Sequence, residues 1–384
     1  MKRKICIVTG TRADWGLLSQ IAAALRSRDD VDLQIVATNM HLMPRFGMTV
    51  DEIKADGFDI DGSVKIFDDN ADVDSPLATA VAMGRCLKEI APVFDRLKPD
   101  MVVLLGDRFE MLAVASAAAV MRIPIVHLHG GEITEGAIDN SIRNAITSLA
   151  SLHLTSTEAY RQRIIDMGEP ADMVINTGSI GVYNALNRPL LDRGELQKSL
   201  SFFIPKGTLL VTYHPATLDT MPVADQCHEL LTALDRFPDN RLLITYPNND
   251  SGGEEIIRQI RQYESLNPEH VRVVPSLGAQ RYLSALQFVA AVVGNSSSGI
   301  IEVPSMGIPT VDIGPRQRGR VAADSVIHCS CCADNIADAI SEALARGRRD
   351  DIENPYYKPD TLEQIVKAIV STPLESFTKC TVRQ

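Results

Sequence analysis

Short apolar runs alternate with longer amphipathic segments through most of the chain. The runs 5–8, 32–37, 101–105 and 123–127 have the length and composition of buried strands, and helical periodicity follows most of them. Strands that alternate with helices in this way form a parallel sheet covered by helices on both faces. The pattern therefore predicts an α/β protein of the doubly wound class.

The alternation occurs in two consecutive series. The polar segment 181–207 separates them, and the second series begins with the apolar run 208–213. A chain of 384 residues exceeds the size of one ordinary hydrophobic core. We therefore expect two Rossmann-like domains with a central cleft, over residues 1–185 and 186–359, with 181–207 as the hinge.

Two further segments complete the expected organisation. The acid-rich stretch 59–76 has little periodicity and predicts a long irregular loop, whereas 77–97 has apolar residues at helical spacing. Residues 360–371 indicate a closing helix.

Charge and hydropathy restrict the functional classes. The net charge is −11 without a long basic run, which argues against a nucleic-acid or anionic-membrane partner. No stretch approaches the roughly 18 apolar residues that span a membrane, and the run 5–8 is too short for a secretory signal. Seven scattered cysteines form no disulfide framework, so we expect a cytoplasmic protein in a reducing compartment.

Ionisable residues follow two of the expected strands. After 101–105 come Asp107, Arg108 and Glu110, and around the end of 123–127 come two histidines and a carboxylate. Ligands of open α/β sheets bind outside these carboxyl ends of strands. Carboxylates and imidazoles that converge there indicate proton transfer on a bound ligand. The candidates beyond the second strand are His127, His129, Glu132 and Asp139.

The two histidines also raise the question of a metal. His127 and His129 are two residues apart, which on one strand would place both on the same face. A third ligand of suitable type is not close in sequence, and Gly130 and Gly131 instead favour close approach of the backbone to a ligand. We therefore expect no metal site.

A serine-rich corner in the second series has the features of an anion site. The run 289–293 is an expected strand that ends at Gly294, Ser296, Ser297 and Ser298 follow, and a helix is expected to carry Glu302 one to two turns in. Backbone N–H groups at such a helix start attract a diphosphate, and the hydroxyls add donors. A capped turn without a ligand is the alternative.

Other strand ends supply cations and one imidazole. Arg12, Arg108 and Arg316 are placed to pair with phosphate, and His214 directly follows the run 208–213. The first turn, 10–16, lacks the glycine spacing of dinucleotide-binding folds, which argues against a nicotinamide or flavin cofactor.

Six motifs occur in order along the chain: GTRAD at 10–14, GDRFE at 106–110, HLHGGE at 127–132, DNSIR at 139–143, GNSSSG at 294–299 and IGPRQRG at 313–319. Together they resemble the hydrolysing UDP-N-acetylglucosamine 2-epimerases of sialic acid biosynthesis. The resemblance covers the chain from the first strand to about residue 330. It implies GT-B architecture, a C-terminal segment, about 360–384, that joins the first domain, and a homodimer or homotetramer.

The resemblance also implies a reaction in which UDP-GlcNAc and water give N-acetylmannosamine and UDP. The C2 proton is removed as UDP leaves, and water then adds to the 2-acetamidoglycal. No cofactor and no metal are implied. The residues implied near the sugar are Asp107, His129 or Glu132, and Asp139. Those implied around the nucleotide are Arg12, Arg108, His214, Asn248, Ser276, Ser296, Ser297, Glu302 and Arg316, with His214 also counted among the catalytic candidates.

The chain departs from the family pattern at His129, where some relatives have a catalytic glutamate, so the proton-transfer role falls to His129 or Glu132. Some relatives also have serine where this chain has Gly16. The same chemistry on GDP-GlcNAc or on a UDP-2,4-diacetamido-trideoxy sugar remains open. A GT-B glycosyltransferase, a non-hydrolysing epimerase and a non-catalytic nucleotide-sugar sensor are further alternatives.

Overall fold

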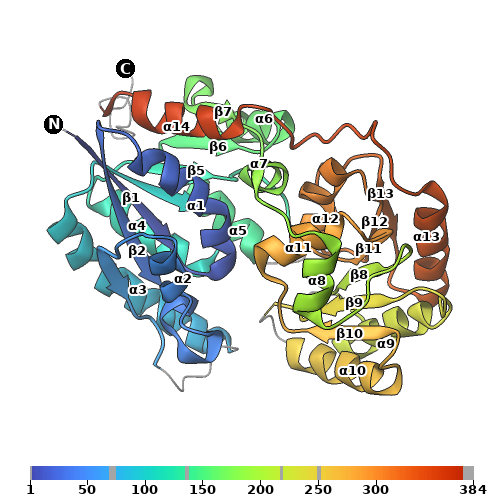
Figure 1. Cartoon of the computed structure of the whole chain (residues 1–384). Helices are drawn as coiled ribbons and strands as arrows, with labels where there is room; N and C mark the ends of the chain where they lie inside the picture. The colour runs from blue at the N-terminus through green and yellow to red at the C-terminus, as the bar shows by residue number, and fades with distance from the viewer. Residues whose placement is uncertain (1, 69–74, 135–137, 217–218, 249–251, 375–384) are drawn as a thin grey trace. The chain divides into compact units, whose positions relative to one another are not determined.

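The structure is a computed structural model that describes residues 2–68, 75–134, 138–216, 219–248 and 252–374. It divides into two compact units (Figure 1). Unit 1 comprises residues 1–132, 138–183 and 358–384, and unit 2 comprises 133–137 and 184–357. Each unit contains one parallel sheet with helices on both faces, which confirms the predicted α/β class.

Unit 1 is built on a seven-stranded sheet of order β3-β2-β1-β4-β5-β6-β7, and the paired strands are parallel. The strands are β1 (Arg3–Thr9), β2 (Val31–Thr38), β3 (Gly62–Val64), β4 (Met101–Leu105), β5 (Ile125–Leu128), β6 (Leu152–Thr155) and β7 (Val174–Asn176). The helices are α1 (Arg12–Arg26), α2 (Val50–Ala55), α3 (Pro76–Leu97), α4 (Phe109–Val120), α5 (Asp139–Leu149), α6 (Glu158–Asp166) and α14 (Thr361–Ser371).

Side chains of β1 alternate between the two layers of the core. Ile5 and Ile7 pack with apolar residues of α1 and α14, whereas Cys6 and Val8 pack with those of α3, α4 and α5. Because strand side chains alternate, one continuous apolar run supplies both faces of the sheet. This is why the strands of unit 1 read as unbroken hydrophobic segments.

The C-terminal helix α14 belongs to unit 1. Arg3, at the start of β1, donates from Nη1 to the carbonyls of Ile369 and Thr372, at 2.9 Å in both cases. Figure 1 shows α14 near the N-terminal end of β1. The last part of the expected C-terminal segment, residues 375–384, lies outside the described residues.

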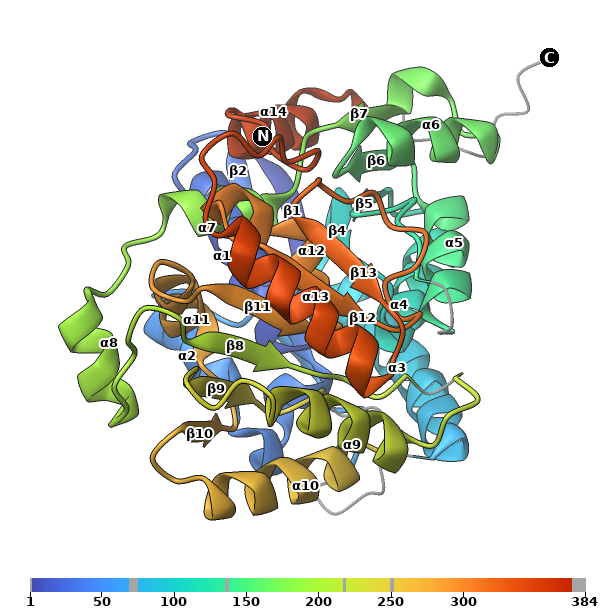
Figure 2. The ribbon, with the colours of Figure 1, turned by 90° about the vertical axis from the view of Figure 1, so that its right-hand side faces the viewer.

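Unit 2 is built on a six-stranded sheet of order β10-β9-β8-β11-β12-β13, again with parallel pairs. The strands are β8 (Leu209–Thr212), β9 (Leu242–Thr245), β10 (Val271–Val274), β11 (Ala291–Gly294), β12 (Thr310–Ile313) and β13 (Val326–Cys329). Its helices are α8 (Arg193–Leu200), α9 (Val223–Leu234), α10 (Gly253–Leu266), α11 (Gly278–Leu286), α12 (Ser297–Ile301) and α13 (Ala333–Arg346), and α7 (Ile180–Asn187) connects the units. Figure 2 shows α13 lying across this sheet. Neither unit, as far as it is described, contains a helix long and apolar enough to cross a membrane.

Each sheet has one point at which the strand order reverses direction. In unit 1 this point lies between β1 and β4, and in unit 2 between β8 and β11. The connections that leave the two central strands there go to opposite faces of the sheet, and in open α/β sheets ligands bind outside the carboxyl ends of such strands. We therefore expect a ligand site at the chain segments that follow these central strands.

Two expectations about irregular segments were wrong. The stretch 181–207 contains α7 and α8 rather than a polar connection, because Asp192 and Glu195 form a reciprocal cap for α8 and Leu196 packs into the core of unit 2. The stretch 59–76 contains the short edge strand β3, paired with β2. Residues 69–74 of that stretch lie outside the described residues.

Candidate active site

A carboxylate–guanidinium pair lies beyond the carboxyl end of β4. Asp107 follows that strand by two residues, and Arg143 on α5 donates from Nη2 to Asp107 Oδ2. Arg143 is buried and also donates from Nη1 to the main-chain carbonyl of Glu132, at 2.7 Å. The arginine therefore holds the Asp107 carboxylate and the Glu132 turn in a fixed relation. The Asp107 side chain remains 24% exposed, so it can meet a ligand.

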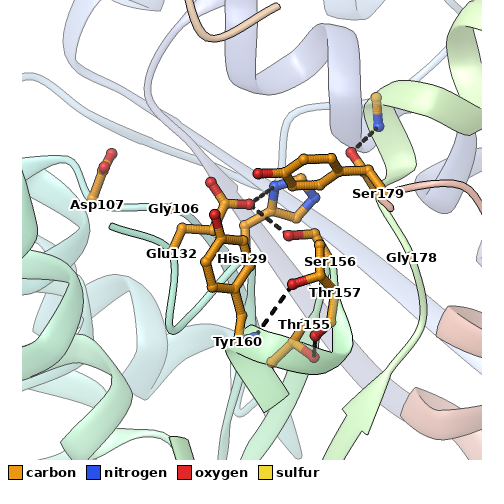
Figure 3. Close-up of polar contacts among 12 residues, drawn as sticks. Gly106, Asp107, His129, Glu132, Thr155, Ser156, Thr157, Tyr160, Gly178 and Ser179 are labelled. Atoms are coloured by element: carbon orange, nitrogen blue, oxygen red, sulfur yellow. Dashed lines mark hydrogen bonds and ion pairs between the residues drawn. The ribbon is translucent and has the colours of Figure 1, made fainter. Parts of the chain in front are cut away.

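A second cluster forms where the chain leaves β5. His129 Nδ1 lies 3.1 Å from Glu132 Oε1, and Ser156 Oγ donates to the same oxygen at 2.8 Å. All three residues are buried. Figure 3 shows them gathered at the strand ends, with Asp107 to one side. The family resemblance implies His129 or Glu132 near the sugar, and the structure brings these two side chains into contact.

The glycines of this turn are required by packing. Gly131 has a φ of 77°, and a Cβ atom there would lie 2.7 Å from the main-chain oxygen of Tyr160. A Cβ atom on Gly130 would lie 2.9 Å from His127 Nδ1. Side chains at either position would therefore collide with the protein itself. The packing of the turn therefore requires glycine at both positions.

His127 has a structural environment. Its Nε2 donates to the carbonyl of Gly106 at 2.7 Å, and its Nδ1 lies 3.2 Å from Thr147 Oγ1. Burial lowers its pKa to about 3, so the ring is neutral. The expectation that His127 and His129 share a face was wrong, because β5 ends at Leu128 and His129 adopts a left-handed φ of 61°.

Asp139 is the first residue of α5, one turn before Arg143, and is half-buried. The structure therefore places it on the element that also carries the partner of Asp107. Residues 135–137, which precede this helix, lie outside the described residues.

Arg12 and Arg108 flank the reversal point of the unit 1 sheet, but each already has a carboxylate partner. Arg12 is the first residue of α1 and pairs with Glu52 at 3.0 Å. Arg108 Nε pairs with Oε1 of the fully buried Glu110 at 2.6 Å. Burial raises the pKa of the nearby Asp14 to about 6, an effect that Arg108 partly offsets. Glu110 thus belongs to this network and not to the cluster around His129.

In unit 2, His214 follows β8 at the reversal point, and its N–H, its carbonyl and its Nδ1 each form a hydrogen bond. The main-chain N–H of Asn248 donates to His214 Nδ1 at 2.9 Å. Because a backbone N–H can only donate, Nδ1 must accept, and the neutral ring carries its proton on Nε2. Burial, with Arg316 as a second cause, lowers the pKa of His214 to about 3. His214 can therefore act as a neutral hydrogen-bond donor.

Asn295, the residue after β11, bridges the two central strands of unit 2. Its Oδ1 accepts from the His214 N–H at 2.7 Å, and its Nδ2 donates to the His214 carbonyl at 2.8 Å. Its own carbonyl accepts from Gln317 Nε2 at 2.8 Å and from Arg316 Nη1 at 3.2 Å. This one buried amide thus connects His214 to the loop that carries Arg316.

The serine-rich corner leads into a short helix. Ser296 is the N-cap of α12, which ends at Ile301, and a 3₁₀ turn follows from Val303. Glu302 is the C-cap of α12, so it lies between one and two turns after the helix begins at Ser297, at the end of the helix rather than inside it.

The other corner residues differ in accessibility. Ser296 and Ser297 are half-buried at the end of β11, and Ser298 Oγ accepts from the Tyr282 hydroxyl at 2.7 Å. Asn248 is half-buried at the end of β9, where its N–H orients His214. Ser276 is exposed, and its Oγ accepts from the N–H of Gly278 at 3.1 Å.

Within the described ranges, no three His, Cys, Asp or Glu side chains are arranged to hold a metal ion. The arrangement instead offers carboxylates and an imidazole in unit 1, and donors suited to an anion in unit 2.

Comparison with known proteins identifies the family. The profile of the UDP-N-acetylglucosamine 2-epimerase family matches residues 23–370. The chain belongs to this family. The family resemblance inferred from the motifs is thereby confirmed.

Curated relatives of this epimerase refine the assignment. It is 40% identical to the GDP/UDP-N,N'-diacetylbacillosamine 2-epimerase (hydrolyzing) of Campylobacter jejuni over 326 residues. This aligned region covers 85% of this chain and 84% of the relative. It is 36% identical to the UDP-N,N'-diacetylbacillosamine 2-epimerase (hydrolyzing) of Legionella pneumophila over 99% of both chains. It is 35% identical to the Escherichia coli polysialic acid biosynthesis protein P7, over 96% of this chain and 93% of the relative. The chain is thus a hydrolysing nucleotide-sugar 2-epimerase.

Solved structures support the fold. The UDP-GlcNAc 2-epimerase of Neisseria meningitidis bound to UDP-GlcNAc matches with a TM-score of 0.78 at 16% identity, over 96% of this chain and 100% of that one. The Methanocaldococcus jannaschii enzyme, in complex with UDP-GlcNAc and UDP, matches with a TM-score of 0.77 at 16% identity, over the same shares. The expected GT-B-like fold with two parallel α/β sheets is therefore confirmed.

Sequence reasoning missed three residues of the epimerase that position candidate site residues. Arg143 lies inside the quoted motif 139–143, and its spacing of four from Asp139 places both on one helix face. Asn295 lies inside the motif 294–299 and could have been identified as a strand-end residue. Ser156 carried no signal, because it follows a strand in a segment without any recognised motif.

Proposed function

We propose that this epimerase converts UDP-GlcNAc and water into N-acetylmannosamine and UDP. The C2 proton leaves together with UDP, which forms the 2-acetamidoglycal. Water then adds at C1 while a proton returns to C2 on the other face. The observation that carries this proposal is the pair of clusters at the strand ends of unit 1, which combine a partly exposed and fixed carboxylate, Asp107, with the buried His129–Glu132 pair.

This chemistry explains why both clusters are needed. A C2 hydrogen is weakly acidic, so its removal requires a positioned base and stabilisation of the departing diphosphate at the same time. Return of a proton to the opposite face requires a second acid. In this proposal Asp107, Asp139 and one member of the His129–Glu132 pair exchange the protons.

Unit 2 supplies the proposed nucleotide side. The neutral His214, with its Nε2–H, and Arg316 can donate to diphosphate oxygens without a charged imidazole. In this proposal the further nucleotide contacts come from Arg12, Arg108, Asn248, Ser276, Ser296, Ser297 and Glu302. No step in this scheme calls for a redox cofactor.

A second substrate is favoured by one specific observation. The relatives from Campylobacter jejuni and Legionella pneumophila, at 40% and 36% identity, are named for diacetylbacillosamine nucleotides. A UDP- or GDP-linked 2,4-diacetamido sugar is therefore the alternative substrate for the same reaction.

The test is incubation with each nucleotide sugar in deuterated water, followed by NMR of the sugar and by assay of released UDP or GDP. Free N-acetylmannosamine with deuterium at C2 supports the first proposal, and preference for the diacetamido sugar supports the second. A nucleotide-linked epimer, transfer to an added acceptor, or no nucleotide release from any of these sugars would overturn both.

A further inference from the structure

The His129–Glu132 pair has an asymmetry that distinguishes the two residues. Glu132 Oε1 accepts from Ser156 and also lies 3.1 Å from His129 Nδ1. His129 Nε2 is buried, and among the described residues it has no hydrogen-bond partner. Buried polar atoms are nearly always paired, so this nitrogen needs a functional explanation.

The contacts define the tautomer of the ring. A carboxylate oxygen can only accept, so His129 must carry its proton on Nδ1 and donate it to Glu132. The Ser156 hydroxyl donates to the same oxygen and is a second contact that holds the carboxylate in place. In the neutral form of this tautomer the lone pair is on Nε2, the ring nitrogen that does not contact Glu132. The His129 side chain is 10% exposed, so part of it reaches the protein surface near the carboxyl end of β5.

The backbone supports the same arrangement. His129 has a left-handed φ of 61°, which is uncommon for a residue other than glycine and costs free energy. Arg143 holds the Glu132 carbonyl at 2.7 Å, and Gly131 allows the tight approach to Tyr160. These contacts maintain the strained position of the imidazole.

We propose that His129 Nε2 is the base that removes the C2 proton, and that Glu132 and Ser156 are positioning residues that hold its tautomer. This inference rests on the proposed function. Nε2 takes the proton from C2, the C–H electron pair forms the C1–C2 double bond, and the C1–O bond breaks with its pair on the departing diphosphate. The imidazole becomes imidazolium, and Glu132 stabilises it.

The decisive variant is His129→Asn. Asparagine tolerates the left-handed backbone, and its side-chain N–H can still donate to Glu132, but it has no basic nitrogen. We expect UDP binding and the melting temperature to stay near those of the wild type. Nucleotide release and C2 deuterium exchange should fall about 100- to 10,000-fold, the usual contribution of a general base. His228→Asn, at an exposed histidine of α9, is the matched control.

A spectroscopic measurement tests the positioning roles without relying on activity. In protein labelled with ¹⁵N-histidine, the His129 signals, assigned by their loss in the asparagine variant, should report a proton on Nδ1 and an unprotonated Nε2. Glu132→Gln and Ser156→Ala should reduce that tautomer preference, and should lower kcat more than they change KM.

Each outcome decides the matter. Wild-type-like exchange in His129→Asn, or a proton on Nε2 in the wild type, would overturn the inference alone. Nucleotide release with accumulation of the glycal would move His129 to the second step and overturn its role in the first. If the wild-type protein acts on none of the nucleotide sugars, the proposed function fails and this inference fails with it.

Discussion

Removal of the Asn295 side chain tests whether its hydrogen bonds to His214 hold the β8–β11 junction of unit 2. Asn295→Ala eliminates two hydrogen bonds, of 2.7 and 2.8 Å, to the N–H and carbonyl of His214. Alanine satisfies neither backbone group, and each unpaired group costs about 1–3 kcal/mol. Because His214 is only partly buried, we expect values in the lower part of that range and a total loss of about 3 kcal/mol.

The measurement is thermal unfolding followed by two signals. Far-UV circular dichroism reports both units, whereas fluorescence of Trp15, the only tryptophan of the chain, reports unit 1. A loss of about 3 kcal/mol lowers the melting temperature of a domain of this size by roughly 9 °C. We expect that fall in the dichroism transition of unit 2. Because His214 loses its anchor, UDP affinity should fall as well.

Asn335→Ala is the matched control, because Asn335 is exposed and bonds only Ser330 among the described contacts. It should change the free energy of unfolding by less than about 0.5 kcal/mol. If Asn295→Ala also remains within that limit, the two bonds to His214 do not hold the β8–β11 junction and the reasoning is refuted.

Three further predictions concern Asp107, Gly131 and two histidines whose pKa values are lowered. Asp107→Asn should abolish nucleotide release, while calorimetry should still detect UDP binding. The control Asp95→Asn, at an exposed carboxylate of α3, should leave nucleotide release and UDP binding unchanged. Turnover near the wild-type rate in Asp107→Asn would contradict the role of Asp107. Gly131→Ala should lower the free energy of unfolding in urea by at least about 2 kcal/mol. Alanine is strained at a φ of 77°, and its Cβ would lie 2.7 Å from the main-chain oxygen of Tyr160. Equal stability of the variant and the wild type would show that the turn adapts. Burial lowers the pKa values of His41 and His214 to about 4 and about 3, so the folded state binds fewer protons than the unfolded state. The free energy of unfolding should therefore fall as the pH drops below about 6.5, and the loss from His41 should be complete near pH 4. A free energy of unfolding that does not change over that range would exclude this linkage.

Most of the secondary structure could be predicted from the sequence because each element has a strong local signal. The strands are continuous apolar runs, as in β1 and β4, since parallel strands are buried on both faces. The expected positions of α3 and α14 also hold, because their apolar residues recur at helical spacing. Local signals failed at 181–207, where the capping of α8 depends on two residues and its burial depends on packing in unit 2.

The candidate site was predictable as a set of residue types at strand ends, because parallel strands all end at the same edge of a sheet. The sequence by itself determined that Asp107, Glu132 and His214 follow buried strands, and the motifs determined the family. It did not determine which side chains pair, because pairing depends on rotamers and on residues that are distant in sequence.

Only the tertiary structure decided the partners. Arg143 reaches Asp107 across 36 positions of sequence, and Ser156 reaches Glu132 across 24. It also decided that His129 leaves the strand in a left-handed conformation, which separates it from His127 and turns it toward Glu132. The physical reason is that charge pairing and buried hydrogen bonds act between neighbours in space, whereas apolar periodicity acts along the chain.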